Sequence, residues 1–424
     1  MRKVTHQVLS NGMDLYSQYD SGGTTHLGGV GVRTGSILDP ENHRGVSHLG
    51  EHVLSAVSHK YSARRVWKII YTVFGGPGKA NVFIDKTSTF FGSPDLRSHR
   101  DLLLVLDLFA SLLKDRLITS SRIAIEKSVI HQEFYLEGTD KPEMVLEDLL
   151  HQIIYKKNPA RIRVDGHLED IKLMTPHHVR SVVKRFFVPK NMFVVILGPK
   201  PQEARRIAEK FFGDLPGQTK PIIEHENGDT CPQLTKIESI EISKGVHQHY
   251  VAIGFPVAPF SSPDAPALEI IAKILGFEAI MELREGNTDF TKGVYRVPCI
   301  LEMTSVHGLL YIWFATTSPD YARYGEQAII QKCYKLCTHL ISEQDFQHFR
   351  YAAMNDYYTA FQDSALDLCN LIVASACNGD RRLVWLNNFR ESFRAVTRES
   401  LRRVARKYLS GNYGRVVIRP QMIE

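Results

Sequence analysis

The sequence predicts an α+β fold of two similar domains, each a mostly antiparallel sheet with helices packed on one face. Segments typical of strands and of amphipathic helices alternate along the chain, the two halves end alike, and a stretch rich in proline and glycine separates them. The 424 residues suffice for two domains of ordinary size, and a hydrophobic content of 43% suits packed cores.

The internal repeat is clearest where residues 175–196 are aligned with residues 397–418, at a constant offset of 222. Thr175 and Thr397 each precede an amphipathic segment, which is followed by a Pro/Gly/Asn break and a β-branched run. Threonine is a good helix N-cap, so each copy is expected to be a capped helix followed by a strand. Two copies of one helix–strand ending predict two related domains.

The boundary between the domains is expected between these copies. Residues 214–235 hold three prolines and two glycines and show no helical periodicity, as a linker would. We therefore expect an N-terminal domain at 1–214, a linker at 215–235 and a C-terminal domain at 236–424.

Expected elements follow the same order in both halves. The first half begins with strands at 13–19 and 27–34, a loop at 35–45, a helix starting near Gly45, a β-rich stretch at 80–92, and helices at 102–113 and 120–137. The second half repeats this order with strands at 239–242 and 248–255, a proline-rich loop, a helix at 265–275, a β-rich stretch at 301–316 and further helices.

Composition narrows the class of protein. The 52 basic and 46 acidic residues are interleaved, which argues against a nucleic-acid-binding surface. No apolar run approaches the roughly 18 residues of a membrane-spanning helix, and the first ten residues lack the features of a signal peptide. Six cysteines are too few for a disulfide scaffold. We therefore expect a cytoplasmic protein with no membrane span and no nucleic-acid partner.

The segment His48-Leu49-Gly50-Glu51-His52 is the main candidate for chemistry. Residues four apart on a helix share a face, so His48 and His52 can reach the same metal ion. Two imidazoles and one carboxylate suit zinc and leave a fourth position for a water, whose pKa the metal lowers to about 7. Glu51 can take the proton of that water. The order HxxEH reverses the HExxH motif of zinc peptidases, although an ordinary surface helix could also carry these five residues.

A third protein ligand is expected from a second helix. Glu126 and Glu133 are seven residues apart in the segment 126–133, so they project from one side of a helix. One glutamate can bind the ion while the other holds a histidine ring by a hydrogen bond. The alternative is a solvated acidic face, which is common on helices.

These segments resemble the pitrilysin family of inverted zinc metallopeptidases, which includes insulin-degrading enzyme and the mitochondrial processing peptidase. The resemblance rests on HLGEH at 48–52, Gly75-Gly76 with Ala80-Asn81-Val82-Phe83, EKSVIHQE at 126–133, and the strand at 191–198. It covers roughly the whole chain, and the length resembles that of the family's small two-domain subunits.

The resemblance implies a role for each matching residue. His48, His52 and Glu133 would bind one Zn²⁺ per chain, Glu51 would be the general base, and Glu126 would support a ligand. Asn81 and Phe83 fall where the family has a strand that receives the substrate, and an extended peptide added to a sheet edge is held by main-chain hydrogen bonds.

The family also has an arginine and a tyrosine in the second domain that reach an active site and stabilise the oxyanion. Arg284 and Tyr295 resemble this pair. Their spacing of eleven is longer than the family pattern, and residues 286–292 have the character of an insertion.

The leading functional hypothesis is a zinc-dependent endopeptidase that cleaves peptides or unfolded, presequence-like segments. The resemblance implies a homodimer, or a heterodimer with a related subunit. The alternative hypothesis is a non-catalytic structural or partner subunit, since the family includes such members. A subunit of that kind usually lacks one or more zinc residues, whereas all five of the residues expected at the site are present here.

Overall fold

The computed structural model of the chain describes residues 3–135, 141–216, 230–285 and 293–421. The protein forms two compact units, and neither is a continuous stretch of chain. The first unit consists of Met1–Glu133, Arg163–His225 and Tyr358–Asn387, and the second of Phe134–Ile162, Glu226–Tyr357 and Asn388–Glu424.

The units therefore differ from the contiguous domains expected at 1–214 and 236–424. Residues Phe134–Ile162 pack with the second unit and Tyr358–Asn387 with the first. Most of the expected linker, residues 217–229, lies outside the described part of the chain.

The first unit is built on a six-stranded sheet and its helices. Its strands are β1 (Thr5–Val8), β2 (Asp14–Tyr19), β3 (Leu27–Val32), β4 (Asn81–Ile84), β5 (Thr89–Gly92) and β6 (Met192–Gly198). Its helices are α1 (Val46–Ala56), α2 (Ala63–Ile69), α3 (His99–Lys114), α4 (Ser120–Glu133), α6 (Leu168–Leu173), α7 (Pro176–Phe186), α8 (Pro201–Phe212), α12 (Ala365–Cys377) and α13 (Val384–Asn387).

The second unit is built on a five-stranded sheet. Its strands are β7 (Glu238–Lys244), β8 (His249–Val257), β9 (Cys299–Met303), β10 (Gly308–Thr316) and β11 (Gly414–Pro420). Its helices are α5 (Pro142–Ile154), α9 (Ala265–Ile280), α10 (Pro319–Thr338), most of α11 (Glu343–Asp363), α14 (Phe389–Arg394) and α15 (Arg398–Leu409).

The two sheets share one topology, which confirms the α+β class and agrees with the repeat in the sequence. The strand orders are β1-β2-β6-β3-β5-β4 and β7-β11-β8-β10-β9, so they coincide from β2 and β7 onward. Each sheet has one parallel pair, β2 with β6 and β7 with β11, and the other pairs are antiparallel. Val194 lies beside Leu15, and Val416, its counterpart at an offset of 222, lies beside Ile240.

The repeated helix starts are capped as the sequence predicts. Thr397 Oγ1 accepts a hydrogen bond from the amide of Ser400 (3.1 Å) ahead of α15, and Ser400 Oγ accepts one from the amide of Thr397 (2.8 Å). Ahead of α7, His178 Nδ1 accepts from the amide of Thr175 (3.3 Å). These bonds satisfy amide groups that the first turn of a helix leaves without partners.

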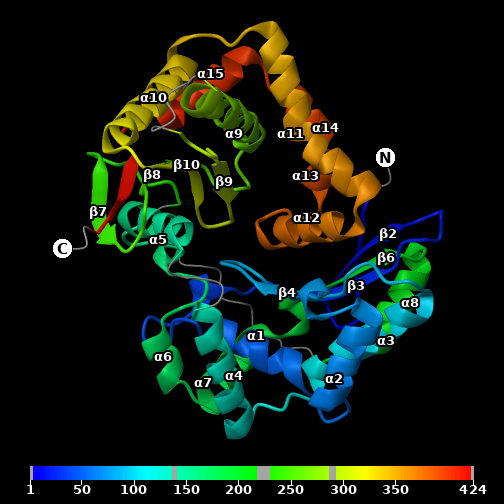
Figure 1. The fold of residues 1–424 in the computed structure, drawn as a ribbon. Coiled ribbons are helices and arrows are strands. Elements are labelled where there is room, and N and C mark those ends of the chain that lie inside the picture. The colour runs from blue at the N-terminus through cyan, green and yellow to red at the C-terminus, as the bar shows by residue number, and fades with distance from the viewer. Residues whose placement is uncertain (1–2, 136–140, 217–229, 286–292, 422–424) are drawn as a thin grey trace. The chain divides into compact units, whose positions relative to one another are not determined.

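Helix α5, from the first half of the chain, covers the sheet of the second unit, and α12, from the second half, covers the sheet of the first unit. This exchange of helices is why neither unit is a continuous stretch of chain. In the first unit, α1, α3 and α8 contact one side of the sheet, while α12 contacts β3 and β6 (Figure 1). In the second unit, α9, α10 and α15 form one layer, and α5 packs on β7, β8 and β11 from the other side (Figure 1). Leu146, Leu150 and Ile154 of α5 are almost completely buried in this contact.

Close packing in the first sheet depends on glycines in β3. A Cβ on Gly28 would lie 2.7 Å from Leu102 Cδ1 of α3, and a Cβ on Gly31 would lie 2.0 Å from Phe193 Cζ of β6. Only glycine lets these side chains approach the strand so closely.

Within the described ranges, none of the helices combines the length and the apolar character needed to cross a bilayer.

Candidate metal centre and active site

The HxxEH segment forms α1, and a buried carboxylate holds the start of this helix. Gly45 precedes α1 with a φ of 94°, in the left-handed region that favours glycine. Asp39 accepts hydrogen bonds from the Gly45 amide (2.7 Å) and from the amide and hydroxyl of Ser47 (3.2 and 2.5 Å). Sequence reasoning placed Asp39 only in a loop. The signal it missed was an acidic residue a few positions before a helix, which is favourable near the positive end of the helix dipole.

Helices α1 and α4 bring three predicted ligands together. His48 Nε2 and His52 Nε2 are 3.2 Å apart, and Glu133 Oε2 lies 3.1 Å from His52 Nε2 and 3.6 Å from His48 Nε2. Two nitrogens bound to a tetrahedral zinc ion are about 3.3 Å apart, given a Zn–N length of about 2.0–2.1 Å. The three side chains are therefore spaced as zinc ligands would be.

The chemistry of the donors also fits a cation. Glu133 Oε2 is a buried atom, and the groups it faces are the two imidazole nitrogens, His52 Nε2 and His48 Nε2. Two imidazole lone pairs and a carboxylate in one largely buried place are costly unless a positive charge lies between them. A divalent ion held by His48, His52 and Glu133 would supply that charge.

The remaining predicted glutamates lie around this cluster in different roles. Glu126 Oε2 is 3.4 Å from His52 Nδ1, on the side of the ring away from the other two ligands. The other oxygen of Glu126 accepts a hydrogen bond from Arg122, which lies one helical turn earlier in α4. Glu126 is thus placed to orient the ring of His52, as a supporting carboxylate does. Sequence reasoning did not identify Arg122, although its spacing of four from Glu126 on a helix was visible.

Glu51 lies beside the cluster, and burial changes the pKa of its carboxyl. Its Oε2 is 3.9 Å from His52 Nε2, farther than Glu133 Oε2. Burial raises the pKa of Glu51 to about 7, and the charge of Glu133 adds to the increase while that of His52 opposes it. For Glu133, burial raises the pKa, but hydrogen bonding and charge at His52 and His48 outweigh it and lower the pKa overall. The pKa values of the two carboxyls are therefore shifted in opposite directions.

A largely apolar pocket opens next to these residues. It has a volume of about 540 Å³, and its walls include Trp67, Ile70, Phe74, Val82 and Phe109 together with Glu51 and His52. Sequence reasoning did not identify this pocket, because its walls come from α2, the segment after it, β4, α3 and α4.

Asn81 and Phe83 lie on β4, which is the last strand of the first sheet. This strand pairs with β5 on one side, with Val82 opposite Phe91 and Phe83 opposite Phe90. Asn81 Nδ2 also donates to Asn370 Oδ1 of α12 (3.0 Å). Val82 lines the pocket, while Asn81 and Phe83 alternate with it along the strand. The position of β4 at an edge is the one that the prediction of peptide binding requires, and that binding stays a prediction.

Arg284 and Tyr295 belong to the second unit. Arg284 Nη1 donates to the main-chain oxygen of Tyr295 (3.3 Å), and the tyrosine side chain is exposed. Residues 286–292, expected as an insertion, lie outside the described residues. The role of this pair in oxyanion stabilisation stays a prediction.

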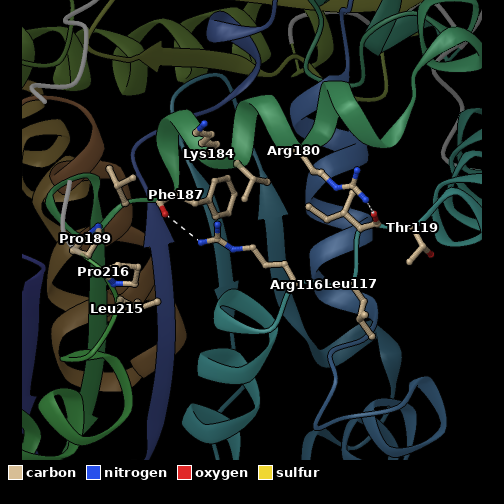
Figure 2. Close-up of a pocket in the computed structure, with 12 residues that line it drawn as sticks. Arg116, Leu117, Thr119, Arg180, Lys184, Phe187, Pro189, Leu215 and Pro216 are labelled. Atoms are coloured by element: carbon tan, nitrogen blue, oxygen red, sulfur yellow. Dashed lines mark hydrogen bonds between the residues drawn. The ribbon is translucent and has the colours of Figure 1, made fainter. Parts of the chain in front are cut away.

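A second pocket of the first unit, of about 590 Å³, contains none of the predicted site residues (Figure 2). Its cationic side chains are largely engaged with main-chain oxygens. Arg116 Nη2 donates to Phe187 O (3.2 Å), and Arg180 Nη2 donates to Ile118 O (2.5 Å). These two bonds link the segment between α3 and α4 to α7 and to the residue that follows it. We therefore interpret the pocket as a gap between packed helices.

Comparison with known proteins agrees with this geometry. The family model described as "Insulinase (Peptidase family M16)" matches residues 15–166, and the model described as "Peptidase M16 inactive domain" matches residues 174–350. The metal cluster lies in the first of these segments.

Relatives with this similarity include proteins of different kinds. The chain is 25% identical over 273 residues to cytochrome b-c1 complex subunit 1 of Caenorhabditis elegans, covering 63% of this chain and 55% of the relative. It is 23% identical over 245 residues to the zinc protease PqqE of Helicobacter pylori, covering 58% and 54%. The match thus spans little more than half the length of these relatives.

The fold is also shared with a solved structure. The crystal structure of a protease from Helicobacter pylori covers 99% of this chain with a TM-score of 0.87, at 20% sequence identity and with 100% of its own length covered. The two family models, the shared fold and the geometry of α1 and α4 lead to one conclusion: the chain belongs to peptidase family M16.

Proposed function

We propose that the protein is a zinc-dependent endopeptidase that cleaves peptides or unfolded, presequence-like segments. The observation that carries this proposal is the convergence of His48, His52 and Glu133 with the carboxyl of Glu51 beside them. A relative described as a zinc protease supports the same chemistry.

In this proposal His48, His52 and Glu133 hold the zinc ion and Glu126 keeps the ring of His52 in place. When bound, zinc supplies an activated water and polarises the scissile carbonyl. Glu51 takes the proton of the water and returns it to the leaving amine, and its carboxyl lies beside the ligands, 3.9 Å from His52 Nε2.

The substrate is held by two features of the first unit. The outer edge of β4, the last strand of the described sheet and the one that carries Asn81 and Phe83, adds the peptide as a further strand through main-chain hydrogen bonds. The apolar pocket accepts a large side chain next to the cleaved bond. Main-chain recognition tolerates many sequences, which suits unfolded segments.

Arg284 and Tyr295 are assigned to stabilise the oxyanion, contributed by a partner subunit of a homodimer or of a heterodimer with a related chain. A relative that is itself a subunit of a larger complex supports an assembly of this kind. The same relative supports the alternative, a non-catalytic structural subunit.

The test is cleavage of a quenched extended peptide by the native protein, by Glu51→Gln and by Glu169→Gln. Glu169 is an exposed glutamate of α6 and serves as the matched control. We expect Glu51→Gln to lose about 10²- to 10⁴-fold in activity while its zinc content stays unchanged, because this residue is a base and not a ligand. A chelator should abolish the activity of the native protein and of the control.

Full activity of Glu51→Gln would contradict the mechanism. A native protein that binds zinc but cleaves no peptide, alone or mixed with a related subunit, would favour the structural alternative.

A further inference from the structure

A second cluster of two histidines and a glutamate lies entirely within the second unit. His151 is on α5, Glu302 is on β9, and His307 is in the turn between β9 and β10. The two Nε2 atoms of the histidines are 3.3 Å apart. Glu302 reaches both rings, with Oε2 3.1 Å from His151 Nε2 and Oε1 3.0 Å from His307 Nε2.

The second cluster resembles the first in its distances, but Glu133 turns one oxygen to both rings whereas Glu302 turns a different oxygen to each ring. The distance between its imidazole Nε2 atoms, 3.3 Å, compares with 3.2 Å for His48 and His52. Its carboxylate contacts of 3.0 and 3.1 Å are shorter than the 3.1 and 3.6 Å in the first cluster. The distance between His151 Nε2 and His307 Nε2 therefore also equals the roughly 3.3 Å expected between two ligand atoms of a tetrahedral zinc ion.

Hydrogen bonds on the outer side of each ring orient its lone pair inward. His151 Nδ1 donates to the main-chain oxygen of Glu147 (3.0 Å). His307 Nδ1 lies 2.8 Å from Thr304 Oγ1, and the hydroxyl of Thr304 is directed to the main-chain oxygen of His307 (3.3 Å). The Nδ1 atom of His307 is therefore assigned as the donor in its contact. Histidine ligands of metals are held in this way, by an N–H bond from the nitrogen that does not bind the ion.

The surroundings favour a positive charge between these groups. His151 is 1% exposed and His307 0%, whereas the side chain of Glu302 is 25% exposed. Two inward lone pairs and a carboxylate in such a place repel one another unless a proton or a metal ion lies between them. The partial exposure of Glu302 provides a route for an ion from solvent. A proton can join one nitrogen to one oxygen, whereas a metal ion can bind both nitrogens and the carboxylate together.

We propose that His151, Glu302 and His307 bind a divalent transition-metal ion, with zinc as the best match, at a site separate from the HxxEH cluster. Such an ion would tie α5 to the β9–β10 turn. The adjacent Glu147 is not placed as a base, because its carboxylate accepts a hydrogen bond from Tyr311 (2.8 Å). The site is therefore assigned to holding the helix on the second sheet and not to hydrolysis.

The test is metal content per chain, measured by mass spectrometry after dialysis against zinc-free buffer. We expect two zinc ions in the native protein, one in His48→Ala, one in His307→Ala and none in the double variant. His247→Ala changes an exposed histidine of the same unit and should retain two. The His48→Ala protein isolates the second site, so its count is informative whether or not the first cluster binds zinc or supports cleavage.

Stability gives a readout that is independent of activity. Zinc added to metal-free His48→Ala should raise its melting temperature, and this increase should be lost in the double variant. Glu302→Gln keeps the shape of the side chain and should lower the zinc affinity of the second site at least tenfold, which covers the case in which His307→Ala does not fold. A His48→Ala protein that binds no zinc, or equal zinc content in His48→Ala and His48→Ala/Glu302→Gln at low zinc, would overturn the proposal.

Discussion

Replacing Glu126 by glutamine should weaken zinc binding at the first cluster without removing a ligand. Glu126 Oε2 lies 3.4 Å from His52 Nδ1, at the long end for a hydrogen bond, so the contribution of this contact by itself is modest. The change also leaves Arg122 with a positive charge that Glu126 no longer balances, close to the bound cation. Supporting carboxylates of this kind contribute about 10- to 100-fold to metal affinity.

We therefore expect Glu126→Gln to lose about 20-fold in zinc affinity, which corresponds to about 1.8 kcal/mol. The assay is competition between the protein and a fluorescent zinc chelator at fixed pH, on a His307→Ala background so that one cluster is measured. Glu169→Gln should bind as tightly as the background protein. The double variant Arg122→Met/Glu126→Gln should lose less than Glu126→Gln alone, because the unbalanced charge is removed as well.

Two results would refute this reasoning. Zinc affinity of Glu126→Gln within twofold of the background would show that the carboxylate does not orient His52. A loss as large as that of Glu133→Gln would show that Glu126 is a direct ligand, contrary to the geometry of the cluster.

Further predictions concern stability. Gly50→Ala should stabilise the protein by about 1 kcal/mol, because Gly50 lies inside α1 and an added Cβ would be 3.8 Å from its nearest neighbour. Thermal melting measures this change, and a lower melting temperature would contradict the prediction. Gly31→Ala should destabilise by about 1–3 kcal/mol, because its Cβ would lie 2.0 Å from Phe193 Cζ, and Phe193→Leu in the same chain should recover part of the loss. Burial raises the pKa of Glu269 to about 8, and the hydrogen bond from Tyr357 opposes this increase. The protonated Glu269 side chain therefore contributes its full stability below the unfolded pKa of 4.5, and this contribution is lost as the pH rises to about 8. Glu269→Gln should therefore gain stability relative to the native protein as the pH rises from 5 to 9, and parallel melting curves against pH would contradict this.

Local sequence patterns were enough to predict which residues of the candidate metal centre share a helix face. The spacing of His48 and His52, and that of Glu126 and Glu133, follows from the period of the α-helix, so each pair could be assigned to one helix face from the sequence. The supporting Asp39 was missed because capping depends on where the loop before α1 folds back. The apolar pocket was missed because its walls come from segments that no period connects.

The cluster of His151, Glu302 and His307 could not be predicted from the sequence. His151 and His307 are 156 residues apart, so no helical or strand period relates them to each other. Only the packing of α5 on the sheet of the second unit brings the rings together.

The sequence by itself determined the α+β class, the repeat of one helix–strand ending, the capped starts of α7 and α15, and the two helices that carry the HxxEH motif and its partner glutamates. These features depend on hydrophobic periodicity and on residues within a few positions of one another, which act before the chain is folded. The tertiary structure decided which sheet α5 and α12 cover, that β4 lies at an edge, and which histidines of distant segments meet. Those outcomes depend on burying apolar faces that are far apart along the chain, and no local pattern encodes which faces will be joined.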